Sequence, residues 1–364
     1  IDRRLPLAEA RMALRAGRSD EGPGEESLSQ AAEELLFKGC AGQDAGAVAR
    51  SFSRLGWSAG ASSESEWLKI SAAGLARTFE PFCAQLGRVL ETATYPDDET
   101  ALWRENAVEE LAARRAQPSF LSEERLRAEL FPGHPYGRGA ADEKRIGAVE
   151  SERLRRYHAR RVRPGSGHLT LVGDLDPKAA RKALESALAG WSRGAIYAPD
   201  DAPALPDHGY RRTVHVERAG SAQASLVVAQ PIEVTPRDPG YLSLAVANHV
   251  LGGTANARLF ENLRTRKGYT YGAYSSFDVY RRGCVWSASA ETRPEVAKAA
   301  HAELLAEATR LREEPIDAAA LSMAKRHLAG LFLMRIASPD RLAAYIAAVV
   351  ESGRDPVVVM GDYQ

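Results

Sequence analysis

One short pattern occurs twice in this sequence, first as Arg54-Leu55-Gly56-Trp57-Ser58-Ala59-Gly60-Ala61 and again, 212 residues later, as Arg266-Lys267-Gly268-Tyr269-Thr270-Tyr271-Gly272-Ala273. In each copy a helical periodicity ends, a glycine follows, and a strand-like pattern begins. Because the order of helices and strands also agrees around both copies, we interpret the chain as a duplication of one unit. In this register Tyr271 corresponds to Ala59 and Arg264 to Phe52, so this Arg/Tyr pair belongs to the second copy only.

Apolar spacing predicts the secondary structure of both halves. In the first half we expect helices over residues 25–38, 45–55, 75–92, 98–115, 151–161 and 178–191, and strands over 67–71 and 168–174. In the second half we expect strands over 213–217, 225–230 and 285–290, and helices over 241–251, 257–266, 295–312, 317–335 and 340–351. Residues 196–209 are rich in Pro, Asp and Gly and predict a linker between an N-terminal lobe, residues 1–195, and a C-terminal lobe, residues 210–364.

The composition is that of an ordinary globular protein, with 45% hydrophobic and 26% charged residues. Basic and acidic residues both number 48, so net charge does not predict nucleic acid or an anionic membrane as a partner. No apolar run approaches the roughly 20 residues that a membrane span needs. Three cysteines without a C-x-x-C pair argue against a disulfide framework or a Cys-ligated zinc. The chain starts at Ile1 without an apolar signal core, so we expect that any export signal was removed or not included.

Several short motifs follow one another in a specific order along the chain. They are Glu33-Glu34-Leu35-Leu36-Phe37-Lys38-Gly39-Cys40, His134-Pro135-Tyr136-Gly137, Val172-Gly173-Asp174, Gln223, Asn248, Leu251-Gly252-Gly253, Arg258-Leu259-Phe260 and the segment from Arg264 to Tyr271. Together they resemble the insulinase/pitrilysin (inverted-zincin) family of zinc peptidases. The resemblance implies an α+β fold of two homologous lobes, each a mainly antiparallel sheet with helices packed on one face. It also implies that two such two-lobe chains close like a clamshell around an unfolded peptide, and against that pattern this chain is short at both ends.

The resemblance also identifies where an active member would hold zinc. Histidines would stand at positions 30 and 34, a general-base Glu at 33, and a third ligand about 76 residues further on. This chain has Gln30, Glu33, Glu34 and Glu110 at these places. Since no imidazole remains, we expect no metal in this chain and no cofactor of its own. An all-oxygen Ca²⁺ or Mg²⁺ site is the alternative, and carboxylates solvated on a helix face are the favoured interpretation.

The Arg/Tyr pair carries the remaining chemistry. A phenol O–H can donate to the oxyanion that develops in peptide hydrolysis, and a guanidinium can hold a substrate carbonyl. Gly268 and Gly272 flank the tyrosine and would let a substrate backbone approach. The resemblance therefore implies catalytic and substrate-binding roles for Arg264 and Tyr271. The alternative is that Arg264 is a helix-end surface cation and Tyr271 a half-buried strand aromatic.

Two histidines have simpler interpretations than metal ligation. We expect His134 to be a turn residue bonded to backbone, and His249 to be a hydrogen-bonded core histidine.

From these patterns we expect the non-zinc subunit of a heterodimeric metallopeptidase, inactive alone. A related chain bearing His-x-x-Glu-His would supply the zinc, and Arg264 and Tyr271 would act on a peptide held there. The alternatives are a catalytically inert scaffold relative, like the peptidase-related core subunits of respiratory complexes, and a standalone peptidase with an unusual metal. The family's bacterial two-chain forms suggest the periplasm, with the cytoplasm as the alternative.

Overall fold

The computed structural model describes residues 5–139, 142–165, 167–191, 203–206 and 212–361. Helices combine with antiparallel sheets, which confirms the predicted α+β class. Close contacts divide the chain into two compact units. Unit 1 comprises Ile1–Leu111, Ala140–Asp201 and Arg335–Glu351, and unit 2 comprises Ala112–Gly139, Ala202–Met334 and Ser352–Gln364. The predicted lobe boundaries at residues 195 and 210 stay predictions, because the predicted linker, residues 196–209, lies largely outside the described residues.

Unit 1 is built on a four-stranded antiparallel sheet with the strand order β4-β5-β1-β6. Its strands are β1 (Leu7–Leu14), β4 (Trp57–Ser63), β5 (Leu68–Leu75) and β6 (Gly167–Gly173). Along β1, Ala10 and Met12 enter the apolar core, whereas Glu9 and Arg11 lie on the opposite face, as the period-two alternation of a strand requires. The sheet therefore has one apolar and one polar face.

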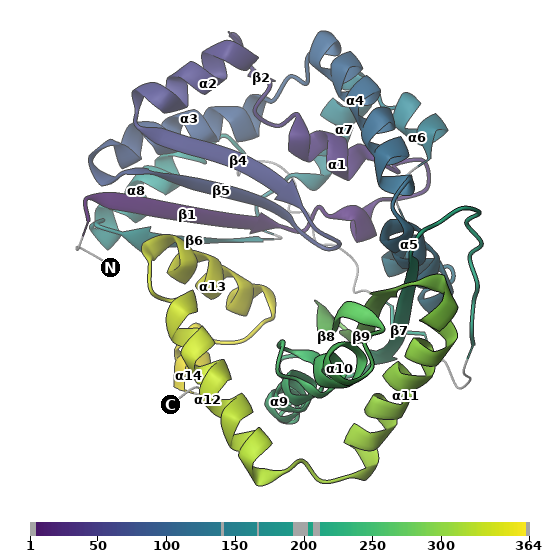
Figure 1. The fold of residues 1–364 in the computed structure, drawn as a ribbon. Helices are drawn as coiled ribbons and strands as arrows, with labels where there is room; N and C mark the ends of the chain where they lie inside the picture. Colours follow the sequence, from purple (N-terminus) through teal and green to yellow (C-terminus); the bar gives the residue numbers. More distant parts are fainter. Residues whose placement is uncertain (1–4, 140–141, 166, 192–202, 207–211, 362–364) are drawn as a thin grey trace. The chain divides into compact units, whose positions relative to one another are not determined.

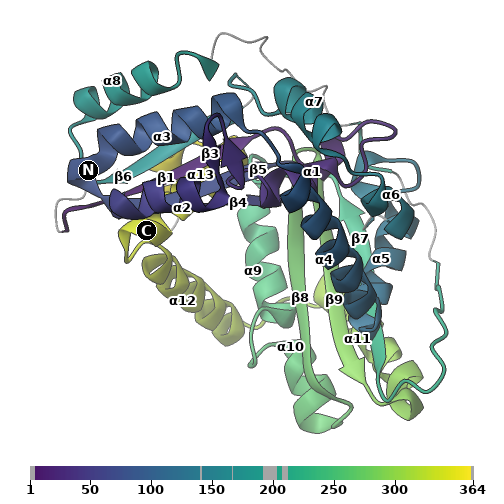
Figure 2. The same ribbon diagram turned by 90° about the horizontal axis from the view of Figure 1, so that it is seen from above.

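Helices cover both faces of this sheet (Figures 1 and 2). Three helices, α2, α3 and α8, lie along the apolar face, and α13 lies across the polar face. The helices of unit 1 are α1 (Leu28–Glu34), α2 (Ala45–Arg54), α3 (Phe79–Thr92), α6 (Glu143–Gly147), α7 (Ser151–Arg161), α8 (Pro177–Ala187) and α13 (Pro339–Glu351), together with most of α4 (Asp97–Arg115). A short hairpin, β2 (Gly39–Cys40) and β3 (Gln43–Asp44), precedes α2.

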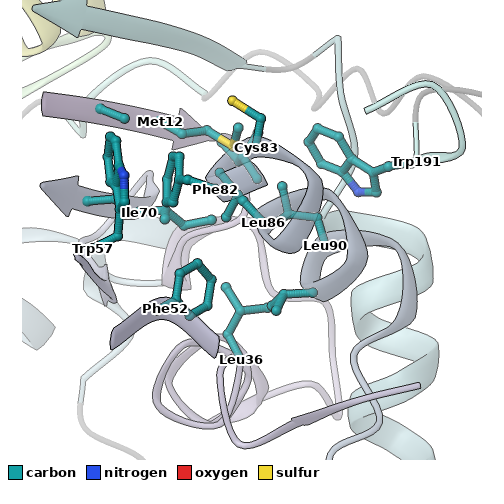
Figure 3. Close-up of a cluster of buried hydrophobic side chains, with 14 of the residues drawn as sticks. Met12, Leu36, Phe52, Trp57, Ile70, Phe82, Cys83, Leu86, Leu90 and Trp191 are labelled. Carbon is teal, nitrogen blue, oxygen red and sulfur yellow. The ribbon is translucent and has the colours of Figure 1, made fainter. Parts of the chain in front are cut away.

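Aromatic packing fills the core of unit 1 (Figure 3). The Trp57 ring stacks on Phe82 with ring centroids 3.8 Å apart, and the Trp57 indole N–H donates to the Leu75 carbonyl at 3.2 Å. Gly74 makes room for this ring, since a Cβ at that position would lie 2.3 Å from the indole. The stacked rings of Trp57 and Phe82 thus join β4 to α3 in the core.

Unit 2 has a three-stranded antiparallel sheet with β9 between β7 and β8. Helices α9 and α11 pack on one face around a core that includes Leu251, Leu259 and Leu263, while α5 packs against β7. The described elements of unit 2 are α5 (Pro118–Leu130), β7 (Ala224–Ile232), α9 (Tyr241–Gly252), α10 (Arg258–Phe260), a π-helix (Glu261–Arg266), β8 (Thr270–Tyr280), β9 (Gly283–Thr292), α11 (Ala297–Glu313), α12 (Ala318–Arg335) and α14 (Pro356–Gly361).

The repeated motif forms the same junction in both units, as predicted. Helix α2 ends at Arg54 and β4 begins at Trp57, while the π-helix ends at Arg266 and β8 begins at Thr270. Gly56 and Gly268 both have left-handed backbones, with φ of +70° and +63°. A side chain would strain this turn, so glycine is required at both positions.

Four expectations for secondary structure need correction. The helix expected over residues 25–38 is only α1, because Ser27 has φ 74° and the chain turns after Glu34. The helix expected over 257–266 divides into α10 and the π-helix. Residues 213–217 form no strand. Helix α5 lies where no helix is expected: Pro118 stands in its first turn, where the missing N–H of proline costs nothing.

Candidate functional site

The degenerate zinc motif lies on α1 in unit 1. The Gln30 amide Nε2 donates to Glu34 Oε1 at 3.0 Å, and the Trp103 indole N–H donates to Glu34 Oε2 at 2.9 Å. Both Glu34 oxygens are therefore already occupied by hydrogen-bond donors. Glu110, at the expected third position, lies exposed on α4.

The environment of Glu33 favours its neutral form. Burial and, to a smaller extent, the neighbouring Glu34 carboxylate raise the pKa of Glu33 from 4.5 to about 7, even though a hydrogen bond with the Ser63 backbone acts in the opposite direction. A carboxyl that holds its proton near neutral pH is a weak cation ligand. Neither this residue set nor any other group of three or more His, Cys, Asp or Glu in the described part of the chain is arranged to hold a metal. Glu34 is already hydrogen-bonded, the pKa of Glu33 is raised, and no imidazole is present. The motif therefore does not fit zinc.

The second candidate region is the turn from the π-helix into β8, in unit 2. The Arg264 guanidinium lies over the Phe260 ring, 4.7 Å from its centroid, and the side chain is exposed. Hydrogen bonds from Gly268 N–H to the Arg264 carbonyl (3.1 Å) and from Tyr269 N–H to the Leu263 carbonyl (2.9 Å) close the helix. A π-helix is uncommon and is often found at functional sites, and Arg264 lies within it.

Tyr271 projects from an irregular start of β8. Pairing with β9 shifts between Thr270 and Ala273, and the Thr270 hydroxyl donates to the Glu291 carbonyl at 2.6 Å while accepting from Gly272 N–H at 3.1 Å. The side chain of Tyr271 is 87% exposed, so the alternative of a half-buried strand aromatic is wrong. A large phenol held this far into solvent is free to meet a ligand.

Gly272 has a structural reason to lack a side chain. A Cβ there would lie 2.7 Å from the Tyr274 ring, whereas a Cβ at Gly268 would meet open space. Space for a substrate backbone at these glycines stays a prediction.

Unit 2 contains a cavity of about 690 Å³ between α5 and one face of its sheet. Tyr271 and Gly272 line it, whereas Arg264 and Gly268 are not among the lining residues. The other lining residues are Ser119, Glu123, Leu126, Arg127, Leu130, Phe131, Gln223, Ser225, Val227, Thr270, Tyr274, Asp278, Tyr280, Val285, Ser287, Ser289, Ala290 and Glu291. The structure thus brings part of the predicted site to a cavity and leaves Arg264 on the neighbouring helix.

A polar network lies inside this cavity. The Arg127 guanidinium donates to Glu123 at 2.9 Å and to the Tyr280 hydroxyl at 3.3 Å. Burial raises the pKa of Asp278, with Arg127 acting in the opposite direction. Sequence reasoning missed the α5 residues because it missed the helix; Pro118 followed by a 13-residue segment free of Gly was the signal.

The two histidines behave as expected. His134 Nδ1 accepts from Tyr136 N–H at 3.1 Å within its turn. His249 is buried on α9, its Nε2 lies 2.9 Å from His327 Nδ1, and burial lowers its pKa. Both are hydrogen-bonded residues of the fold, which confirms the predictions.

Comparison with known proteins identifies the family. Residues 148–328 match the family model described as the peptidase M16 inactive domain. The chain belongs to the peptidase M16 family. M16 enzymes are the insulinase/pitrilysin peptidases, so the resemblance inferred from the motifs is confirmed. Among the described residues, no helix is both long and apolar enough to span a membrane.

Individual M16 proteins show how far the similarity extends. An uncharacterised zinc protease of Streptomyces coelicolor is 24% identical over 71% of this chain and 57% of its own length. The chain spans about three fifths of the length of the first curated relatives that it matches. The peptidase M16 inactive domain from Pseudomonas fluorescens superposes with a TM-score of 0.85 and 25% identity, covering 100% of this chain and 86% of that one. A protease from Helicobacter pylori reaches a TM-score of 0.89 at 18% identity, covering 100% and 88%, and shares the fold.

Proposed function

We propose that this chain is the non-zinc-binding subunit of a two-chain zinc peptidase that cleaves unfolded peptides. The M16 partner would carry His-x-x-Glu-His and the zinc, and this chain would contribute Arg264 and Tyr271 to the same site. Zinc bound to the partner would activate the water that attacks the peptide. The present chain would bind and orient the substrate.

One observation carries this proposal: Tyr271 is 87% exposed beside a cavity, in a chain whose zinc motif has lost both histidines. A phenol at this position gains nothing from burial, so its exposure is explained best by a ligand or partner. The Arg264 guanidinium stacks over the Phe260 ring and presents a forked set of N–H donors. Both groups suit a peptide carbonyl that becomes negatively charged during hydrolysis.

Reconstitution with the partner chain tests the proposal. Tyr271→Phe and Arg264→Ala should each lower the peptidase activity of the pair by roughly 10²-fold, the scale for losing one oxyanion donor. Arg266→Ala is the matched control, because Arg266 is another exposed arginine of the π-helix and does not line the cavity. Unchanged turnover in both site variants would sink the proposal and favour the inert scaffold relative.

The compartment is part of the same proposal. A periplasmic location follows from the likeness to bacterial two-chain enzymes, and the cytoplasm is the alternative. Fractionation of the source cells, with detection of the native chain, decides between them.

A further inference from the structure

The lining of the cavity in unit 2 carries a net negative charge. Its lining includes three carboxylates, Glu123, Asp278 and Glu291, and one guanidinium, Arg127, which leaves two net negative charges. Arg127 is held by Glu123 and Tyr280, so it is not available to a new anion. An anionic ligand would therefore meet repulsion, and an apolar one would leave the carboxylates desolvated without compensation.

Aromatic and small uncharged residues line much of the rest of the cavity. Tyr271, Tyr274 and Tyr280 line the cavity from β8, and the faces of such rings attract cations. On β7 and β9 the lining residues include Ser225, Ser287 and Ser289, which leave space over the sheet and offer hydroxyl acceptors. A volume of about 690 Å³ is sufficient for several residues of a peptide.

An inorganic cation fits less well than an organic one. The described residues contain no group of three or more His, Cys, Asp or Glu placed to bind a metal ion, so the carboxylates of the cavity are too dispersed for one. A long basic side chain can instead place its methylene groups against the tyrosines and its charge near Asp278.

We propose that this cavity is a specificity subsite that binds an arginine or lysine side chain of the peptide substrate. The inference rests on the proposed function, because it assigns a substrate class to the site that contains Tyr271. Asp278 provides the charge, and Tyr271 and Tyr274 provide the walls. Peptides with a basic residue would be retained, and peptides with acidic residues would be excluded.

The test uses the full chain alone, without partner or zinc, and measures the fluorescence anisotropy of labelled pentapeptides. The peptides are Ala-Ala-X-Ala-Ala, where X is arginine, its neutral isostere citrulline, or glutamate. The arginine peptide should bind about tenfold more tightly than the citrulline peptide, the scale of one partly screened ion pair. The glutamate peptide should bind most weakly. Equal affinity for the arginine and citrulline peptides would overturn the proposal.

Two variants and a control assign the effect to the cavity. Asp278→Asn should remove the preference for arginine over citrulline without changing citrulline binding. Ser289→Arg adds a positive charge at an exposed position of β9 and should weaken the arginine peptide at least as much, even if Asp278→Asn perturbs folding. Glu295→Gln removes an exposed carboxylate outside the lining and should leave the preference intact. If Asp278→Asn and Ser289→Arg both retain the preference, the basic side chain binds elsewhere.

The outcome is separable from that of the proposed function. If the chain prefers the arginine peptide but its Tyr271→Phe variant supports full activity, the basic subsite is supported and the catalytic role of Tyr271 is rejected. If Tyr271→Phe loses activity but the chain shows no preference for the arginine peptide, the catalytic role is supported and the basic subsite is rejected.

Discussion

Each sheet receives one helix on the face opposite its apolar core, α13 in unit 1 and α5 in unit 2 (Figure 1). Helix α13 buries Ala343, Ala347 and Val349. Its ends are held by ion pairs of Asp340 with Arg11 and of Glu351 with Lys69, the latter at 2.8 Å. Helix α5 buries no residue completely, and its inward side chains line the cavity.

The difference between the two helices follows from side-chain size. Alanines let α13 approach the strands closely. On α5, Leu126 and Arg127 line the cavity above a sheet face that carries serines, and Leu130 lines it while also packing against a small hydrophobic cluster. Helix α13 therefore packs closely on its sheet, whereas unit 2 keeps a cavity next to Tyr271. The two units of one duplicated fold thus differ in how closely a helix packs on the second face of the sheet.

On the apolar face of each sheet, opposite α13 and α5, the helical layers should be equally well packed in both units. Trp57→Ala in unit 1 and Leu259→Ala in unit 2 should each lower the free energy of unfolding by about 3–5 kcal/mol, because both side chains are buried and well packed. Urea unfolding measures this, with Leu102→Ala, at an exposed position, as the control. A loss below about 1 kcal/mol in either core would break the equivalence of the two layers.

A larger side chain beneath the covering helix should have a different effect on stability in the two units. Ala343→Leu under α13 should cost about 1–3 kcal/mol through overpacking, since Ala343 is fully buried. Ser289→Leu in the cavity under α5 should change stability by no more than about 0.5 kcal/mol. Ala344→Leu, at an exposed position of α13, is the control for helix propensity. Equal costs for the two substitutions would mean that the cavity closes in solution.

The smallest expected effect concerns the remnant motif of unit 1. Because the pKa of Glu33 rises from 4.5 to about 7 on folding, the ionised carboxylate destabilises the native state. Glu33→Gln should therefore match the parent below pH 4.5 and become more stable by about 1 kcal/mol above pH 7, after allowance for solvent screening. Thermal unfolding between pH 4 and 8 measures the difference, with Glu110→Gln as the control. A gain that is constant with pH would show that Glu33 does not change its ionisation on folding.

Local features of the fold could be predicted from sequence because short-range constraints fix them. Gly56 and Gly268 take the same left-handed turn, so the two junctions were recognisable from eight residues each. The long helices were predicted because apolar spacing persists along them. The failures have local causes too: Ser27 shortens α1 through a left-handed backbone, and a single Pro118 both follows one helix and starts another.

The sequence by itself determined the family, the duplication, and the loss of imidazoles at positions 30 and 34, because these depend only on which residues follow one another. Only the tertiary structure decided that α13 joins the first sheet and α5 the second. It also decided that Tyr271 stands exposed beside a cavity that Arg264 does not line. The reason is physical. Both helices cover strands that are distant in sequence, and the closeness of their packing depends on side-chain volumes from several segments at once, which no local pattern records.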